Sequence, residues 1–201
     1  MTGKLEMSPA LDFRRTVAIV AAANLAYFAV EGAVALSIGS VSLFADSVDF
    51  LEDAAVNLLI FAAVGWTLAR RARLGSFLAL LLLAPAIAFF WTFWTKIVDP
   101  RPPAATPLAL TGLGALVVNL VCAWLLARFR THEGSLARAA FLSARNDAFA
   151  NALIIGAGLV TAAQPSVWPD VLVGLLIALI NIDAAKEVHD AAREEHAAAH
   201  A

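Results

Sequence analysis

Long runs of apolar residues, separated by short polar stretches, dominate the chain. A helix needs about 20 mostly apolar residues to cross the roughly 30 Å hydrocarbon core of a bilayer. Six stretches meet this requirement, at about residues 16–37, 41–66, 76–97, 106–127, 136–162 and 169–186. The polar–apolar alternation of a membrane β-barrel is absent, so helices are the spanning structure that satisfies the backbone. The pattern predicts an all-α, integral membrane bundle of six transmembrane helices.

Composition supports this class and excludes several others. Of the 201 residues, 61% are hydrophobic and 15% are charged, whereas soluble domains have about 45–50% and about 25%. A soluble single-domain enzyme is therefore excluded. The net charge of −2 argues against a nucleic-acid partner, because such proteins need basic patches to neutralise phosphates. The single cysteine, Cys122, cannot form an intramolecular disulfide. The first apolar run is of full spanning length and another follows at once, so we expect a retained anchor.

Lysine and arginine residues indicate the orientation of the spans. Of the 14, eleven fall on the side of the two termini, Lys96 and Arg101 fall on the other, and Arg145 lies a little inside the fifth predicted span. Because cytoplasmic loops carry the excess of positive charge, we expect both termini in the cytoplasm. The predicted organisation is a cytoplasmic N-terminal segment at 1–14, a transmembrane domain at 15–187 and a short cytoplasmic tail at 188–201. The expected location is the lipid bilayer of a bacterial inner membrane, as a multi-pass protein. The tryptophans agree with these spans, since all five lie near predicted helix ends, as in an aromatic belt: Trp66, Trp91, Trp94, Trp124 and Trp168.

Four acidic residues crowd the second predicted helix: Asp46, Asp49, Glu52 and Asp53. At about 100° per residue, the three aspartates share one narrow face, and Glu52 lies at its edge. A carboxylate at mid-membrane costs at least about 2.5–3.5 kcal/mol on insertion scales, so each is a functional candidate. Two close anions in a low dielectric cannot both stay charged without a counter-charge. These acids therefore hold either protons or a cation.

The fifth predicted helix carries a matching polar stripe. Ser143, Asp147 and Asn151 follow one another at intervals of four, and Asn146 lies beside them. Other helices add further polar residues to the predicted interior: Asn24, Tyr27, Glu31 and Asn119. Such stripes can be satisfied only by facing one another inside the bundle.

For several of these residues, hydrogen bonding between helices competes with a role in ion binding. We prefer the structural role for Asn24, Asn119 and Asn151, and we leave Glu31 open between the two. Asp46, near the outer end of its helix, is expected at a solvated rim or beside the ligands. The tail histidines His189, His196 and His200 are candidates for a surface metal site, although a solvated, fraying helix explains them better.

One continuous region carries a family resemblance. It runs Asn24-Leu-Ala-Tyr-Phe-Ala-Val-Glu31 and then Gly39-Ser-Val-Ser-Leu-Phe-Ala-Asp-Ser-Val-Asp-Phe-Leu-Glu-Asp53. This region resembles the cation diffusion facilitator family of divalent metal transporters, and the likeness extends over about residues 15–190. In that family the second helix typically has a His or Asp, followed by an Asp four residues later. Asp49 and Asp53 match this pair, and Asp46 matches a recurrent acid before it.

The fifth helix resembles the second half-site of the family only in part. Asp147 and Asn151 match the family pattern, but Ser143 stands where a His or Asp is usual. The resemblance implies a metal bound near-tetrahedrally between the second and fifth helices by Asp49, Asp53, Ser143 and Asp147. The residues expected beside these ligands or along the access path are Asp46, Asn146, Asn151, Glu31 and Glu52.

The resemblance also implies a function: export of divalent transition metals in exchange for protons by a homodimer that is not an enzyme. The metal is cargo, and no resident cofactor is implied. We rank zinc first; cadmium, manganese, iron and cobalt stay open, because an oxygen-rich ligand set favours harder ions. The chain ends about fifteen residues after the last span, so we expect a short form that lacks the cytoplasmic C-terminal domain of the family and dimerises through its membrane helices.

Two other function classes compete with transport. The missing fifth-helix histidine and the missing cytoplasmic domain also suit a non-transporting membrane protein that binds metal or acts as a scaffold. An intramembrane aspartyl protease would need a Gly-x-Gly-Asp motif, and the sequence contains none. No histidine lies inside a predicted span to serve as a base, so hydrolysis is not expected.

Overall fold

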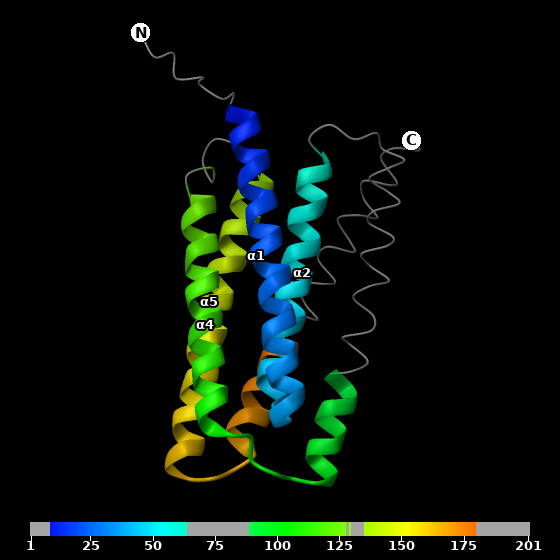
Figure 1. Cartoon of the computed structure of the whole chain (residues 1–201), viewed down its shortest axis with the longest axis vertical. Helices are drawn as coiled ribbons and strands as arrows, with labels where there is room; N and C mark the ends of the chain where they lie inside the picture. Colours follow the sequence, from blue (N-terminus) through cyan, green and yellow to red (C-terminus); the bar gives the residue numbers. More distant parts are fainter. Residues whose placement is uncertain (1–8, 64–88, 128, 130–134, 180–201) are drawn as a thin grey trace.

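A computed structural model describes residues 9–63, 89–127, 129 and 135–179 (Figure 1). These residues form helices and connecting turns, with no strand among them. The four long helices are α1 (Pro9–Ile38), α2 (Val41–Ala63), α4 (Ala105–Ala127) and α5 (Ser135–Ala163). Two shorter helical segments, at 89–98 and Trp168–Leu179, complete the described fold. The predicted all-α architecture is confirmed.

Three of the described helices are long and apolar enough to cross a membrane: Leu11–Ile38, Ala105–Ala127 and Ala144–Ala163. The 23-residue helix α2 is of similar length, but it carries the four carboxylates between Asp46 and Asp53. The described helices follow the predicted spans closely, except that α1 begins at Pro9 rather than near residue 16. Proline is favoured at this first position, where a missing N–H costs nothing. Pro85 and the tail at 188–201 lie outside the described residues.

A tight turn joins α1 to α2. Gly39 has a φ of 63°, a left-handed conformation that suits glycine. Ser40 then caps α2, since its Oγ accepts the backbone N–H of Leu43 at 3.2 Å. The two helices therefore run antiparallel, side by side (Figure 1).

Small residues bring α4 and α5 together. A Cβ placed on Gly158 would lie 2.9 Å from the Cβ of Ala109, and one on Gly112 would lie 2.8 Å from the Ile154 side chain. Neither helix could approach so closely with larger residues at these positions. Such small-residue contacts are typical of helix packing in membranes.

The interior has an apolar layer at each end and a polar layer between them. One apolar cluster gathers Phe13, Val17, Ile60 and Leu126, with their neighbours. The other contains Ala35, Leu43, Leu108, Ile154 and their neighbours. On each long helix, one or two buried polar residues fall between these clusters: Asn24, Glu31, Asp46, Asn57, Asn119 and Asn151. Other buried polar residues, such as Thr16, Ser42 and Thr161, lie nearer the ends of their helices. Many large apolar side chains face outwards instead, including Trp91, Trp94, Trp124 and Trp168. Polar groups inside and apolar groups outside define a helical membrane bundle.

Candidate metal centre

The four acidic residues of helix α2 differ in how far they are buried. Asp46 is fully buried, whereas Asp49, Glu52 and Asp53 are partly buried. The solvated rim expected as one environment for Asp46 is therefore wrong for this conformation. Because the helical repeat directs the three aspartates to one side, they meet the helices packed against that side.

Helix α5 supplies the acid that faces them. Asp147 is partly buried, and Asn146 is exposed and accepts a hydrogen bond from Arg145 at 3.4 Å. Ser143 belongs to α5, but its side chain lies outside the described part of the structure. Its expected role as a ligand stays a prediction.

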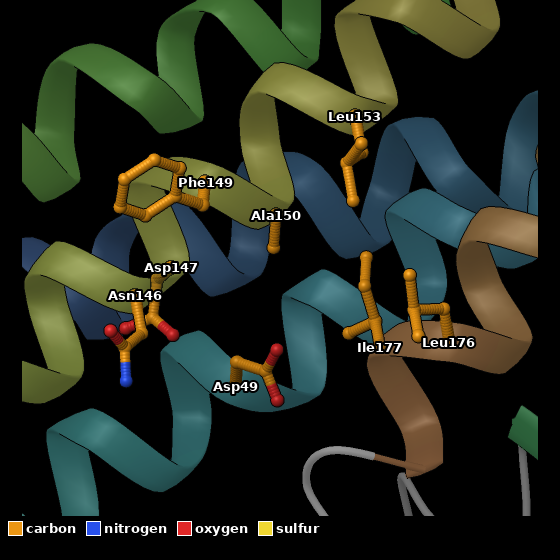
Figure 2. A pocket seen from close by; sticks show the side chains of 8 residues that line it. All are labelled: Asp49, Asn146, Asp147, Phe149, Ala150, Leu153, Leu176 and Ile177. Carbon is orange, nitrogen blue, oxygen red and sulfur yellow. The ribbon is translucent and has the colours of Figure 1, made fainter.

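Asp49 and Asp147 line one cavity of about 270 Å³ between α2, α5 and the helix Trp168–Leu179 (Figure 2). The first two helices contribute the carboxylates, and the third contributes the apolar side chains of Leu176 and Ile177. The remaining lining residues are Asn146, Phe149, Ala150 and Leu153. The cavity thus has a polar side built by α2 and α5 and an apolar side built by α5 and the helix Trp168–Leu179.

The carboxylates from the two helices interact with one another. Asp147 lies close enough to Asp49 and Asp53 for the three carboxyl groups to interact electrostatically. Neighbouring carboxylates in a low dielectric cannot all stay charged without a counter-charge. Across the described residues, no group of three or more His, Cys, Asp or Glu side chains is arranged to hold a metal ion. The structure therefore brings the acids of α2 and α5 together in pairs, without an assembled set of ligands.

A second polar network lies beside this cavity. Asn119 of α4 donates from Nδ2 to Asn151 Oδ1 at 3.1 Å, and Asn151 Nδ2 donates to Asp46 Oδ2 at 2.6 Å. Asp46 also interacts electrostatically with Glu31 of α1, whose two buried carboxylate oxygens have no hydrogen-bond partner. In addition, the Sγ of Cys122 lies 3.7 Å from Asn24 Oδ1. The expected hydrogen bonding between helices is confirmed for Asn119 and Asn151.

Asp170 is a buried acid that the sequence pattern did not single out. Its Oδ1 accepts bonds from the Ser40 and Ser42 hydroxyls, each at 2.6 Å, and from Ser42 N at 3.1 Å. Its Oδ2 accepts from Val41 N at 2.8 Å. Asp170 thus ties the helix Trp168–Leu179 to the positive end of α2. The sequence signal that could have identified Asp170 is a lone acidic residue in the first turn of an otherwise apolar segment.

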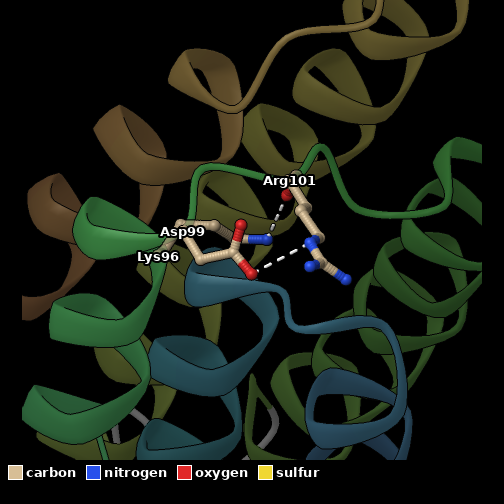
Figure 3. Close-up of polar contacts among 3 residues, drawn as sticks. All are labelled: Lys96, Asp99 and Arg101. Atoms are coloured by element: carbon tan, nitrogen blue, oxygen red, sulfur yellow. Dashed lines mark hydrogen bonds and ion pairs between the residues drawn. The ribbon is translucent and has the colours of Figure 1, made fainter.

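The two basic residues expected on the outer side lie together near one end of the bundle. The Lys96 Nζ donates to the Arg101 backbone oxygen at 2.6 Å, and the Arg101 Nε lies 2.9 Å from an Asp99 carboxylate oxygen (Figure 3). Both side chains of the Arg101–Asp99 pair are well exposed. The candidate tail ligands His189, His196 and His200 lie outside the described residues.

An apolar-faced bundle with carboxylates from two helices at one shared cavity belongs to the class of integral membrane proteins that handle cations. Comparison with known families makes the class specific. The model of the cation efflux transmembrane domain matches residues 17–189. The chain therefore belongs to the cation efflux family, whose members are membrane transporters of metal cations. No curated protein shows significant similarity to the chain.

Proposed function

We propose that the protein exports divalent transition metal ions in exchange for protons, with the ion bound between α2 and α5. The observation that carries this proposal is the shared cavity, where Asp49 and Asp147 come from different helices and reach the same space. Family membership supports metal cation efflux, and the donors around the cavity add the mechanism.

Asp49, Asp53 and Asp147 are the proposed ligands, with Ser143 as a weaker fourth oxygen. Before the ion binds, a proton relieves the electrostatic repulsion between the neighbouring carboxylates of Asp53 and Asp147. An incoming dication replaces that proton and draws the three carboxylates together, because it neutralises them more strongly. Exchange of metal for protons then follows from the ligand chemistry itself.

The metal site opens alternately to the two sides of the membrane, and this opening involves the apolar wall of the same cavity. Leu176 and Ile177 belong to a helix that contributes no acid to the site. Movement of this helix against α2 and α5 opens or closes the cavity without breaking a metal–ligand bond. We further propose that two copies pair through their membrane helices.

Zinc is the first cargo to test, since it tolerates carboxylate ligands, and manganese is the alternative favoured by an all-oxygen set. The experiment uses proteoliposomes that contain a metal-sensitive dye and carry a pH gradient. We expect metal uptake that depends on the gradient. Parallel assays with zinc, cadmium, manganese, iron and cobalt give the order of preference.

Two variants test the site. Asp49→Ala and Asp147→Ala are each expected to reduce flux by more than about 100-fold, since loss of residues next to ligands alone costs 10–100-fold. Asp99→Ala, which removes an exposed acid of the loop, is the matched control and should retain wild-type flux. Intact flux in both site variants would refute the assignment. Metal binding by the wild type without flux under any gradient would instead indicate a metal-binding or scaffold protein.

A further inference from the structure

The helix that supplies part of the apolar wall of the metal cavity is tied to the start of α2. We call this helix, Trp168–Leu179, the wall helix. Asp170 in its first turn accepts hydrogen bonds from the hydroxyls of Ser40 and Ser42 and from the N–H groups of Val41 and Ser42. The Asp170 carboxylate is fully buried, so water does not compete for these bonds. A charged acceptor with this many donors makes a strong local contact, which we call the Asp170 tether.

The contact between the wall helix and α2 continues for one more turn and then ends at the cavity. A Cβ placed on Gly174 would lie 2.8 Å from the backbone at the start of α2, so the two helices touch from Asp170 to Gly174. Directly beyond, Leu176 and Ile177 line the cavity that Asp49 of α2 also lines (Figure 2). Ile177 lies about 10 Å along the helix axis from Asp170. The tether is therefore about two turns away from the cavity.

An apolar cluster runs from the tether to the cavity. Its buried members come from α2, α4, α5 and the wall helix, and include Val41, Leu43, Leu108, Ile154, Val171 and Ile177. Val171 follows Asp170 in the chain, and Ile177 lines the cavity. A hydrated dication cannot cross such a layer, because the layer offers no polar group to replace its water. This end of the bundle, which we expect to face outwards, is closed in this structure.

The turn between α1 and α2 is also held from another helix. Lys96, in the segment 89–98, is buried, and its Nζ lies 3.5 Å from the position that a Cβ on Gly39 would take. The same Nζ donates to the Arg101 backbone oxygen at 2.6 Å. The ammonium group thereby faces the negative C-terminal end of α1. The turn that receives the Asp170 tether is therefore a fixed point of the bundle.

We infer that Asp170 is a positioning residue that keeps the metal cavity closed on the outer side, and that outward release of the ion requires the Asp170 tether to break. The inference rests on the proposed function and adds a residue that does not touch the ion. The wall helix can move against the cavity acids while the tether holds, and the outer end then stays closed. Outward opening has to separate the wall helix from α2 at the tether. The strength of the tether therefore determines how rarely the outer end opens.

The first test measures access to the cavity wall and needs no metal. Cys122→Ala with Leu176→Cys gives a protein with one cysteine, at the cavity wall. A membrane-impermeant thiol reagent is then added to membrane vesicles of either orientation. In this background, Asp170→Asn should raise the labelling rate from the outer side by more than about 10-fold, because hydrogen bonds to a charged group are lost. Labelling from the inner side should stay unchanged.

A milder variant and a matched control keep this test decisive if Asp170→Asn does not fold. Ser42→Ala removes one hydroxyl donor to Asp170 and should raise labelling from the outer side by about 3–10-fold. Ser37→Ala is the control, because Ser37 is exposed and its hydroxyl donates to the Val34 carbonyl of its own helix. Labelling of this control should match the background.

Two results of the labelling would overturn the inference. One is an outer labelling rate that is unchanged in Ser42→Ala, or in Asp170→Asn if that variant folds. The other is an equal increase from both sides, because a general loosening of the fold would then explain the labelling.

The second test measures zinc flux in proteoliposomes without a pH gradient. With a weaker tether, both ends of the cavity can be open at once, so Ser42→Ala should pass zinc down its own gradient about 3–10-fold faster than wild type. Ser37→Ala should match the wild type. A zinc leak in Ser42→Ala equal to that of wild type overturns the role of the tether in transport. Wild-type protein that carries neither zinc nor manganese refutes the proposed function instead, and the labelling still decides whether Asp170 closes the outer end.

Discussion

Asp170 and Glu31 are both fully buried carboxylates, yet their surroundings differ in every other respect. Asp170 receives four hydrogen bonds, two from backbone N–H groups and two from hydroxyls. Glu31 receives none from a fixed donor and lies beside another acid. Burial alone therefore does not distinguish a structural acid from a functional one.

The number of hydrogen-bond donors around a buried carboxylate distinguishes the two roles. A carboxylate with all its acceptors used is stable as an anion and has nothing left with which to bind an ion. A carboxylate without donors is stable only when a proton or a cation arrives. The difference assigns Asp170 to holding the fold, whereas no fixed donor compensates a negative charge on Glu31.

Removing Asp170 is expected to have the largest effect on stability. In Asp170→Ala the N-terminus of α2 loses its acceptor, and the free energy of unfolding should fall by about 2–5 kcal/mol. Reversible unfolding in mixed micelles, followed by tryptophan fluorescence, measures this change. Asp99→Ala breaks only the exposed pair with Arg101 and should cost less than about 1 kcal/mol. Equal losses in the two variants would contradict the role given to Asp170.

Gly174 tests the same contact by steric means and should have a smaller effect. A Cβ at this position would lie 2.8 Å from the backbone of Val41 and Ser42, so the last described helix would have to move away from α2. Gly174→Ala should lower the free energy of unfolding by about 1–3 kcal/mol. Gly156→Ala is the matched control, because that position has open space, and helix propensity there predicts a gain of about 0.5–1 kcal/mol. A neutral Gly174→Ala would show that this approach does not constrain the fold.

Conversion of Glu31 to an amide should have the smallest effect and the opposite sign to Asp170→Ala. The side-chain amide introduced by Glu31→Gln can donate to Asp46 Oδ1, the acceptor that has no fixed donor. We expect no loss of stability, and a gain of up to about 1 kcal/mol. The same unfolding assay, run beside Asp170→Asn, gives the comparison. A loss above about 1 kcal/mol in Glu31→Gln would place Glu31 with Asp170 among the structural acids.

Much of this architecture could be predicted from one sequence because the membrane imposes strong local rules. An apolar run must become a helix, since the backbone has no other partner in hydrocarbon. The spans predicted at 41–66 and 106–127 accordingly agree with the observed helices Val41–Ala63 and Ala105–Ala127 to within a few residues. The shared face of Asp46, Asp49 and Asp53 also follows from the helical repeat alone.

Contacts between helices could not be obtained in this way. Ser40 and Asp170 are 130 residues apart, and no local rule pairs the start of one helix with an acid in another. Glu31 could have been a bonded structural residue or a site for a cation, and Asp46 could have faced water. Only the packing of α2 against α1 and α5 distinguishes these environments.

The sequence by itself determined the class, the helices and the helix faces that carry acids, because those depend on length, hydropathy and a fixed turn per residue. The tertiary structure decided which acids meet a donor, which meet another acid and which meet an open cavity. The physical reason is that the state of a buried charge depends on the few atoms around it, and here those atoms come from distant parts of the chain.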